Sequence, residues 1–232
     1  MKKWIFTFSL LAFGLVLTAQ QNCGTFFPFE EKTVMEYASF DKKGKKESTV
    51  EHRVAFVEDF GEGSIKARVE TKVMDEEGEE QMNADYEVSC KDNEITFDMI
   101  SLLSPQMTQA FSGMEMTITG DGLSMPENLE VGQTLPEAST EIKAGTGNLN
   151  LIKMTISISD RKVEAKESIT TESGATYECY RIRHIMESKM LISKQFEIVE
   201  WYAEGFGMIR SETYNKKGKL ESSTELQSFT RG

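Results

Sequence analysis

The chain has 232 residues, of which 38 are acidic and 26 are basic, so its formal net charge is −12 at pH 7. An acidic balance of this size argues against nucleic acid or an anionic membrane as partner. The length is sufficient for a full hydrophobic core, either as one large β domain or as two small ones.

The first 19 residues have the pattern of a secretory signal peptide. Two lysines precede an almost wholly apolar run of 14 residues from Trp4 to Leu17, and small residues follow it. A helix that crosses a bilayer needs roughly 20 residues, so a cleaved signal is favoured over a membrane anchor. We expect cleavage after Ala19 or Gln20, which leaves residues 20–232 as one exported domain, periplasmic or secreted, without a transmembrane segment.

Three cysteines follow the signal, Cys23, Cys90 and Cys179, in a compartment that can oxidise them. The Gln-Gln-Asn sequence before Cys23 lacks the small residue that lipoprotein processing needs, so no lipid anchor is expected there. Cys90 lies on the apolar parity of its strand and Cys179 on a parity with two arginines, which disfavours a bond between these two. We therefore expect Cys23 to be a partner in any bridge, with the third thiol buried and inert or paired between molecules.

Hairpin signals dominate the chain up to residue 99. Apolar and polar residues alternate over residues 65–73 and 94–99, which is typical of strands with one buried face. Asp41–Gly44 and Asp75–Gly78 both read Asx-x-x-Gly, the pattern of a type I turn closed by a left-handed glycine, and Asp92-Asn93 indicates a tight reversal. These signals predict an antiparallel sheet with one wet face.

One short helix is predicted over residues 104–113, since Ser104 can cap it, Pro105 suits its first position and Gly113 can end it. Methionines gather around this segment. They indicate either adaptable core packing or a pliable apolar pocket that could hold an acyl chain or a hydrophobic segment. The residues of this predicted pocket are Met99, Met107, Phe111, Met114 and Met116.

The second half of the chain begins with a stretch richer in glycine and proline, residues 120–146, which is a candidate junction between two lobes. Strict alternation resumes over residues 152–159, and Ser173-Gly174 and Asn215–Gly218 indicate two further turns. About ten or eleven strands follow from the whole pattern. The predicted fold is all-β and mainly antiparallel, a curved sheet or barrel with one short helix.

The first and last turns share the sequence Lys-Lys-Gly-Lys. One favourable turn could simply have been used twice. Alternatively, the two hairpins meet at the seam of a closing sheet and form a basic rim, suited to an anionic headgroup or a glycan. The lysines of this predicted rim are Lys42, Lys43, Lys45, Lys46, Lys216, Lys217 and Lys219.

The chain has only two histidines, His52 and His184, each on the more apolar parity of its strand. Inward, neutral, hydrogen-bonded histidines are the first expectation, and a cavity site shared with a carboxylate is the alternative. Zinc spacings, calcium loops, nucleophile elbows, phosphate loops and dinucleotide fingerprints are all missing from the sequence, so we predict no cofactor, no metal and no catalytic residue.

Several segments together resemble the TapB-like family of exported proteins. They are Asn22–Gly24 with Phe29, Glu36-Tyr37 with the Lys-Lys-Gly-Lys turn, Arg161–Val163, Lys166–Ile169, Glu178–Tyr180 and Trp201–Arg210. The resemblance implies secretion and a curved antiparallel sheet, more distantly similar in shape to periplasmic lipid carriers, and it brings no established activity or catalytic residue. Gly205 and Gly207 belong to this pattern, and glycines within a strand predict a bulge or a close backbone approach.

Together these features favour a non-enzymatic protein that binds or carries a hydrophobic ligand or client, such as a lipid, in an apolar cavity. A structural module with a filled core, which presents its surface to another envelope protein, is the alternative. A hydrolase that uses a carboxylate or histidine pair is the third hypothesis.

Overall fold

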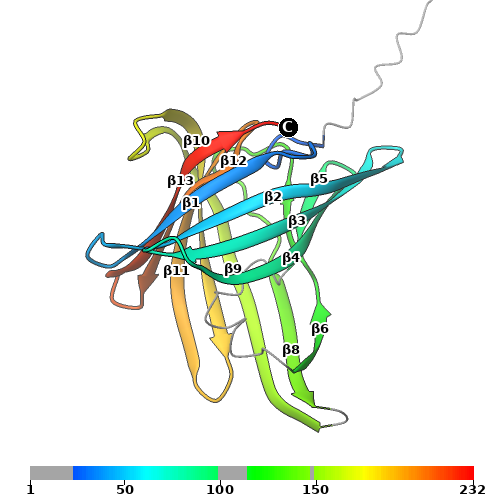
Figure 1. Cartoon of the computed structure of the whole chain (residues 1–232), viewed down its shortest axis with the longest axis vertical. Coiled ribbons are helices and arrows are strands. Elements are labelled where there is room, and N and C mark those ends of the chain that lie inside the picture. Colours follow the sequence, from blue (N-terminus) through cyan, green and yellow to red (C-terminus); the bar gives the residue numbers. More distant parts are fainter. Residues whose placement is uncertain (1–22, 99–113, 147–148) are drawn as a thin grey trace, which may run out of the picture.

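A computed structural model describes residues 23–98, 114–146 and 149–232. All regular structure in these ranges is β, and every strand belongs to one antiparallel sheet (Figure 1). In chain order the strands are β1 (Val34–Asp41), β2 (Lys46–Gly61), β3 (Ser64–Asp75), β4 (Glu80–Lys91), β5 (Glu94–Phe97), β6 (Glu115–Gly120), β7 (Leu123–Pro126), β8 (Ala138–Thr146), β9 (Leu149–Thr170), β10 (Thr176–Lys189), β11 (Ser193–Ala203), β12 (Gly207–Asn215) and β13 (Leu220–Thr230).

The predicted curved all-β sheet is confirmed, with 13 strands rather than ten or eleven. The alternation predicted over residues 94–99 is confirmed as far as β5, and the surplus includes β7, whose four residues are too few to show a clear alternation. The predicted helix over residues 104–113 lies outside the described residues. No helix in the described part of the chain has the length and apolarity needed to cross a membrane.

The predicted turns are found where the sequence places them. The glycines that close the three Asx-x-x-Gly turns, Gly44, Gly78 and Gly218, have φ angles of 78°, 86° and 67°. In each turn the Asx side chain accepts hydrogen bonds from the two backbone N–H groups two and four residues later. These turns are therefore fixed by local chemistry alone.

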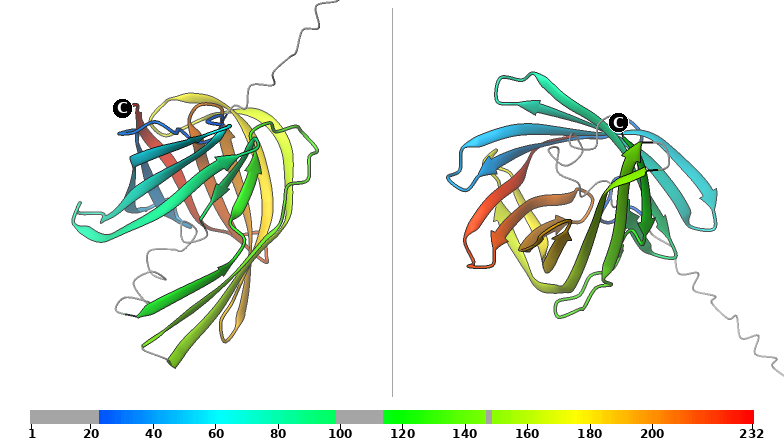
Figure 2. Two further views of the ribbon diagram at one scale, coloured as in Figure 1. Left: turned by 90° about the vertical axis from the view of Figure 1, so that its right-hand side faces the viewer. Right: turned by 90° about the horizontal axis from the view of Figure 1, so that it is seen from below.

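The sheet order is β6-β8-β9-β10-β11-β12-β13-β1-β2-β3-β4-β5-β7, so β6 and β7 are its two edges. These edges are nevertheless separated in the chain only by Asp121 and Gly122. The segment Glu115–Pro126 thus pairs first with β8 and then with β5. The hydrogen-bonded sheet is open, and the chain itself spans the opening of the strongly curved sheet (Figure 2).

Two glycines allow this crossing. Gly120 has a φ of 134°, and a Cβ atom there would lie 2.2 Å from the carbonyl oxygen of Ser139. At Gly122 a Cβ atom would lie 2.5 Å from the side chain of Thr96 and 2.8 Å from the carbonyl oxygen of Phe97. A side chain at Gly120 would press on β8, and one at Gly122 would press on β5, so either would displace the crossing segment. The glycines at the start of the predicted junction over residues 120–146 therefore allow the chain to cross from its pairing with β8 to its pairing with β5.

The buried residues form two apolar clusters. The larger one extends over most of the sheet and includes Phe26, Val69, Ile182 and Ile209. The smaller one lies on β7, β8 and β9 and consists of Leu123, Ala138, Ile142, Ala144, Met154, Ile156 and Ile158. The alternation predicted over residues 152–159 is confirmed, because the even-numbered residues Met154, Ile156 and Ile158 are buried.

The strand register defines two ends of the sheet. Asp41 pairs with Ser222, so the turns of the β1–β2 and β12–β13 hairpins lie side by side. Phe196 pairs with Asn215, which puts the β10–β11 turn at the same end. We call this end the hairpin-tip rim, made of residues 42–45, 76–79, 190–192 and 216–219. The opposite end, which holds residues 23–33 and the turns at 92–93 and 204–206, is called the closed end.

Candidate cavity site

A cavity of about 510 Å³ lies within the concave side of the curved sheet. Because side chains alternate along a strand, every second side chain of each long strand points toward the concave face of the sheet. The walls come from β1 to β4 on one side and from β10 to β13 on the other. They are lined chiefly by aromatic rings, methionines and small hydroxyl residues.

The N-terminal segment closes one end of this cavity. Phe26 and Phe27 line it, and the ring of Phe26 packs edge-on against Tyr180 with the centroids 5.7 Å apart. Residues near the turns, among them Phe40, Glu47 and Ser222, line the part of the cavity next to the hairpin-tip rim. The cavity therefore runs from the closed end toward the rim.

One disulfide and three hydrogen bonds between distant segments hold the closed end. Cys23 forms a disulfide with Cys90, 67 residues away in the chain. The buried carboxylate of Glu127 accepts hydrogen bonds from the backbone N–H groups of Gly24 and Thr25, at 2.8 and 2.7 Å. The backbone N–H of Gly205 donates to the carbonyl of Thr25 at 2.7 Å. The N-terminal segment is thus bound to β4, to the loop after β7 and to the β11–β12 turn.

Cys23 is a partner in the bridge, as predicted, and this pairing leaves its sulfur unavailable for a lipid anchor. The third thiol, Cys179, is buried, and burial raises its pKa to about 12, so it stays a protonated, inert thiol at neutral pH. Among the described residues, Cys23, Cys90 and Glu127 form the one cluster with metal-ligand geometry. The disulfide consumes both sulfurs, which leaves a single carboxylate.

The close approach predicted for Gly205 and Gly207 is present at Gly207. Its φ is 91°, and a Cβ atom there would lie 3.1 Å from the carbonyl oxygen of Phe26. The register of β11 against β12 shifts between Trp201 and Tyr202, just before this turn. The glycine therefore lets the β11–β12 hairpin lie directly against the N-terminal segment.

His52 lies on the cavity wall within a group of aromatic residues. Its Nδ1 atom is 2.9 Å from Oγ1 of Thr71, and the rings of Tyr37 and Tyr86 pack edge-on against it with centroids 5.6 Å away. Desolvation lowers the pKa of His52 to about 4 and raises the pKa values of both tyrosines. At neutral pH this wall therefore carries hydrogen-bonding groups without a net charge.

His184 and Glu200 form a second polar group on the opposite wall. His184 is buried, its Nδ1 atom has no hydrogen-bond partner, and it lies 3.9 Å from Oε2 of Glu200. Burial and, to a smaller extent, the cations of Arg161 and Arg183 lower the pKa of His184 to about 3. Burial raises the pKa of Glu200 to about 7, against the opposing effects of Arg161 and of a hydrogen bond with Tyr202. Near neutral pH this wall offers one neutral imidazole and a half-protonated carboxyl.

Arg161 is the buried cation next to this group. Its Nη1 atom donates to the carbonyl oxygens of Ser124 and Pro136, both at 2.6 Å. Ser124 belongs to β7 and Pro136 precedes β8, so the arginine ties the chain that spans the sheet opening to β9. Desolvation lowers the pKa of its guanidinium below the usual value, although the carboxyl of Glu200 counters this.

The predicted histidines therefore line one cavity together with a carboxylate. The predicted methionine pocket stays a prediction. Met99, Met107 and Phe111 lie outside the described residues, Met114 packs against the smaller cluster, and Met116 is on β6. The methionines that do line the cavity are Met35, Met82, Met186 and Met208. Sequence reasoning missed Tyr37, Tyr86 and Glu200, although each lies on the inward parity of a strand that also carries apolar residues.

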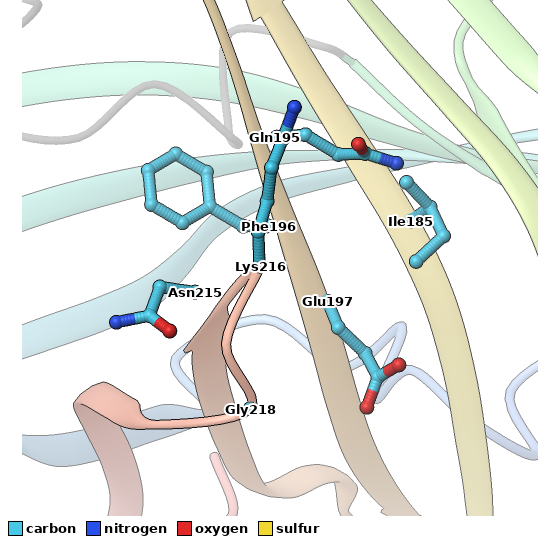
Figure 3. A pocket seen from close by; sticks show the side chains of 7 residues that line it. All are labelled: Ile185, Gln195, Phe196, Glu197, Asn215, Lys216 and Gly218. Atoms are coloured by element: carbon cyan, nitrogen blue, oxygen red, sulfur yellow. The ribbon is translucent and has the colours of Figure 1, made fainter.

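A second, shallower pocket of about 380 Å³ lies between the β10–β11 hairpin and the β12–β13 turn (Figure 3). Figure 3 shows Phe196 and Glu197 on opposite sides of β11, as alternation requires. Its other lining residues are Ile185, Gln195, Asn215, Lys216 and Gly218. Because the lining mixes one acidic, one basic and two amide side chains at the surface, we assign no chemistry to it.

The structure thus belongs to the class of proteins in which one open antiparallel sheet curves around a cavity. The chain belongs to the DUF3108-like family, whose sequence pattern matches residues 30–226. This match does not confirm the TapB-like name that the motifs suggest. No curated protein matches the chain with significant similarity.

Two solved structures share the fold. One is a protein of Bacteroides fragilis that is described as exported and as having a YmcC-like fold, with 19% identity and a TM-score of 0.74. The other is a protein of Parabacteroides distasonis that is described as a lipoprotein, with 24% identity and a TM-score of 0.73. In both cases the match covers 90% of this chain and 100% of the other. Both descriptions agree with the export predicted from the N-terminus.

Proposed function

We propose that this is an exported binding protein that holds an amphipathic ligand in the cavity, with the apolar part of the ligand against the methionines and aromatic rings. The observation that carries the proposal is a cavity of about 510 Å³ in which aromatic rings and methionines lie beside two polar groups, one at His52 and one at His184 and Glu200. Sites for small apolar molecules have this composition, in which the polar groups fix orientation.

The polar groups favour a particular kind of headgroup. His52 and the Glu200–His184 pair face the cavity as hydrogen-bonding groups without a full charge at neutral pH. The unpartnered Nδ1 atom of His184 can accept or donate one more bond, depending on its tautomer. A hydroxyl or amide fits such a site better than a strongly anionic headgroup, which would lie next to Glu200.

The direct test is to extract the natively purified mature protein with organic solvent and analyse the extract by mass spectrometry. A lipid or other amphiphile in stoichiometric amount supports the proposal. A clean extract, together with no binding of the neutral apolar fluorophore N-phenyl-1-naphthylamine, would instead favour a module that acts through its surface.

A matched pair of variants localises the binding. Ala84 lines the cavity, and its neighbour Asn83 is exposed on the outer face of β4. Ala84→Phe is expected to abolish fluorophore binding because the added ring occupies the cavity. Asn83→Phe adds the same ring outside and is expected to leave binding intact. Equal binding by both variants would place the fluorophore elsewhere.

We further propose that the cavity binds its ligand without chemical turnover. The Thr71 hydroxyl beside His52 is placed like a nucleophile next to a base, but an imidazole with a pKa of about 4 is a weak base. Hydrolysis of p-nitrophenyl esters by the wild type, lost in both His52→Gln and Thr71→Val, would establish a hydrolase in place of this proposal.

A further inference from the structure

The turn of the β10–β11 hairpin exposes three consecutive apolar side chains. Leu191 is 97% exposed, Ile192 is 77% exposed and Met190 is 48% exposed. A folded protein rarely presents a run of this kind to water at the end of a projecting hairpin, unless the run meets an apolar partner. The hairpin extends beyond the neighbouring β12–β13 turn, as Figure 1 shows.

Exposed lysines flank this apolar tip, together with the exposed Glu187. Lys189 and Lys194 flank it on β10 and β11, and Lys216, Lys217 and Lys219 lie on the adjacent β12–β13 turn. The shallow pocket lined by Phe196 and Lys216 lies between the two tips. An apolar tip flanked by lysines can bind an anionic bilayer surface. The apolar side chains then lie among the acyl chains, and the lysines lie at the headgroups.

The β1–β2 turn continues this basic surface around the rim. The pairing of Asp41 with Ser222 sets Lys42 and Lys43 beside the β12–β13 turn. The basic surface ends at the β3–β4 turn, where Lys45 forms an ion pair with Glu76 at 2.7 Å. The acidic residues of the rim, Glu76, Glu77 and Glu79, are on that turn, so the basic surface is confined to the β1–β2, β12–β13 and β10–β11 hairpins.

We propose that the hairpin-tip rim is a membrane-docking surface, which inserts Met190, Leu191 and Ile192 into the interface of an anionic phospholipid bilayer. The cavity extends toward this same rim through Phe40 and Ser222. Docking would thus present the cavity to the lipid phase. The docking proposal does not depend on what the cavity holds, so its failure would leave the binding proposal standing.

The opposite end of the sheet supplies a matched control. Phe56 and Phe60 on β2 are 54% and 58% exposed, but they lie next to Glu58, Asp59 and Glu62. These rings offer a comparable apolar area in an acidic setting. If exposed apolar area alone caused membrane binding, both ends would contribute equally.

The test is co-sedimentation of the purified mature protein with vesicles of phosphatidylethanolamine and phosphatidylglycerol at low salt. Leu191→Ser with Ile192→Ser is expected to lower the partition coefficient at least about tenfold, because two side chains lose their apolar burial. Phe56→Ser with Phe60→Ser is expected to leave it within about twofold of the wild type. Both pairs are surface replacements, and circular dichroism would confirm that the fold is retained.

The lysines give a second, independent measurement. Lys216→Gln with Lys217→Gln is expected to weaken binding about tenfold at low salt, and the difference should vanish in about 1 M salt because exposed charges are then screened. A wild type that does not sediment with the vesicles overturns the proposal. Equal loss of binding in the tip variant and in the Phe56/Phe60 variant also overturns it.

Discussion

The two ends of the sheet are built in different ways. The closed end joins segments far apart in the chain, through the Cys23–Cys90 disulfide, the Glu127 carboxylate and the contact between Gly207 and Phe26. The hairpin-tip rim consists of turns that are each held by their own Asx residue and glycine. This difference indicates that tertiary bonds stabilise the closed end, whereas the rim can change sequence or partner with little effect on the fold.

The largest effect should come from the disulfide. It joins residues 67 apart, so its removal gives the unfolded chain much more freedom, and we expect Cys23→Ser with Cys90→Ser to lose about 4 kcal/mol of unfolding free energy. Urea unfolding measures this loss. The control is Cys179→Ser, which leaves the disulfide in place and is measured with and without a reductant. A loss below 1 kcal/mol would contradict the view that tertiary bonds hold the closed end.

Glu200 tests whether the cavity floor near the closed end is desolvated. Its pKa in the folded state is about 7, against an ordinary value of 4.5, so between these values only the unfolded chain releases the proton. The Glu200 carboxyl therefore lowers the free energy of unfolding as the pH rises from 4.5 to 7, by up to about 3 kcal/mol in total. Above about pH 7 this loss is complete. The lowered pKa values of His52 and His184 act in the opposite direction over an overlapping range, because the unfolded chain takes up protons below pH 6.5.

A difference measurement separates these contributions. Glu200→Gln should become more stable relative to the wild type as the pH rises from 4.5 to 7, while the histidine effects cancel between the two proteins. Urea midpoints at a series of pH values follow this change. Glu197→Gln removes a carboxylate from the outer face of the same strand, and the same trend in that variant would refute a specific effect of the cavity.

Glu127 tests the second bond of the closed end. Glu127→Gln replaces one acceptor oxygen with an NH₂ group that faces a backbone N–H, so we expect a loss of about 2 kcal/mol. Denaturant unfolding measures it, with the exposed Glu130→Gln as the matched control. A loss no larger than in the control would mean that the disulfide, the phenylalanines and the Gly205–Thr25 hydrogen bond hold the N-terminal segment without help from Glu127.

The two ends also differ in how far sequence reasoning could predict them. The turns at Asp41, Asp75 and Asn215 were predictable because an Asx residue and a glycine at fixed spacing determine the local conformation. Parity placed His52 and His184 on the inner face for a similarly local reason. The sequence could not decide whether the two lysine turns lie side by side, since only the pairing of β1 with β13 brings them together.

The closed end was far less predictable. Nothing local to Glu127 indicates that its carboxylate binds the N–H groups of Gly24 and Thr25, about 100 residues earlier. The selection of Cys90 as the partner of Cys23 likewise depends on β4 and the N-terminal segment meeting in space. The importance of Glu200 arises from desolvation, which a sequence with 38 acidic residues does not reveal. The short strand β7 was not predicted because its pairing with β5 depends on the crossing of the chain at Gly120 and Gly122.

A pair of glycine replacements compares the two ends directly, and Gly44→Ala has the smallest expected effect. Gly44 has a φ of 78° with open space around its Cα, so Gly44→Ala is expected to cost only the left-handed backbone penalty of about 1 kcal/mol. Gly207 has a similar φ of 91°, but its added Cβ would also press on the carbonyl oxygen of Phe26 at 3.1 Å, so Gly207→Ala should cost about 2 kcal/mol more than Gly44→Ala. Urea unfolding of both variants measures the difference. Since the backbone strain is shared, the excess at Gly207 reports the close packing of the closed end, and equal losses would show that the β11–β12 turn can move away from the N-terminal segment as freely as a turn on the rim.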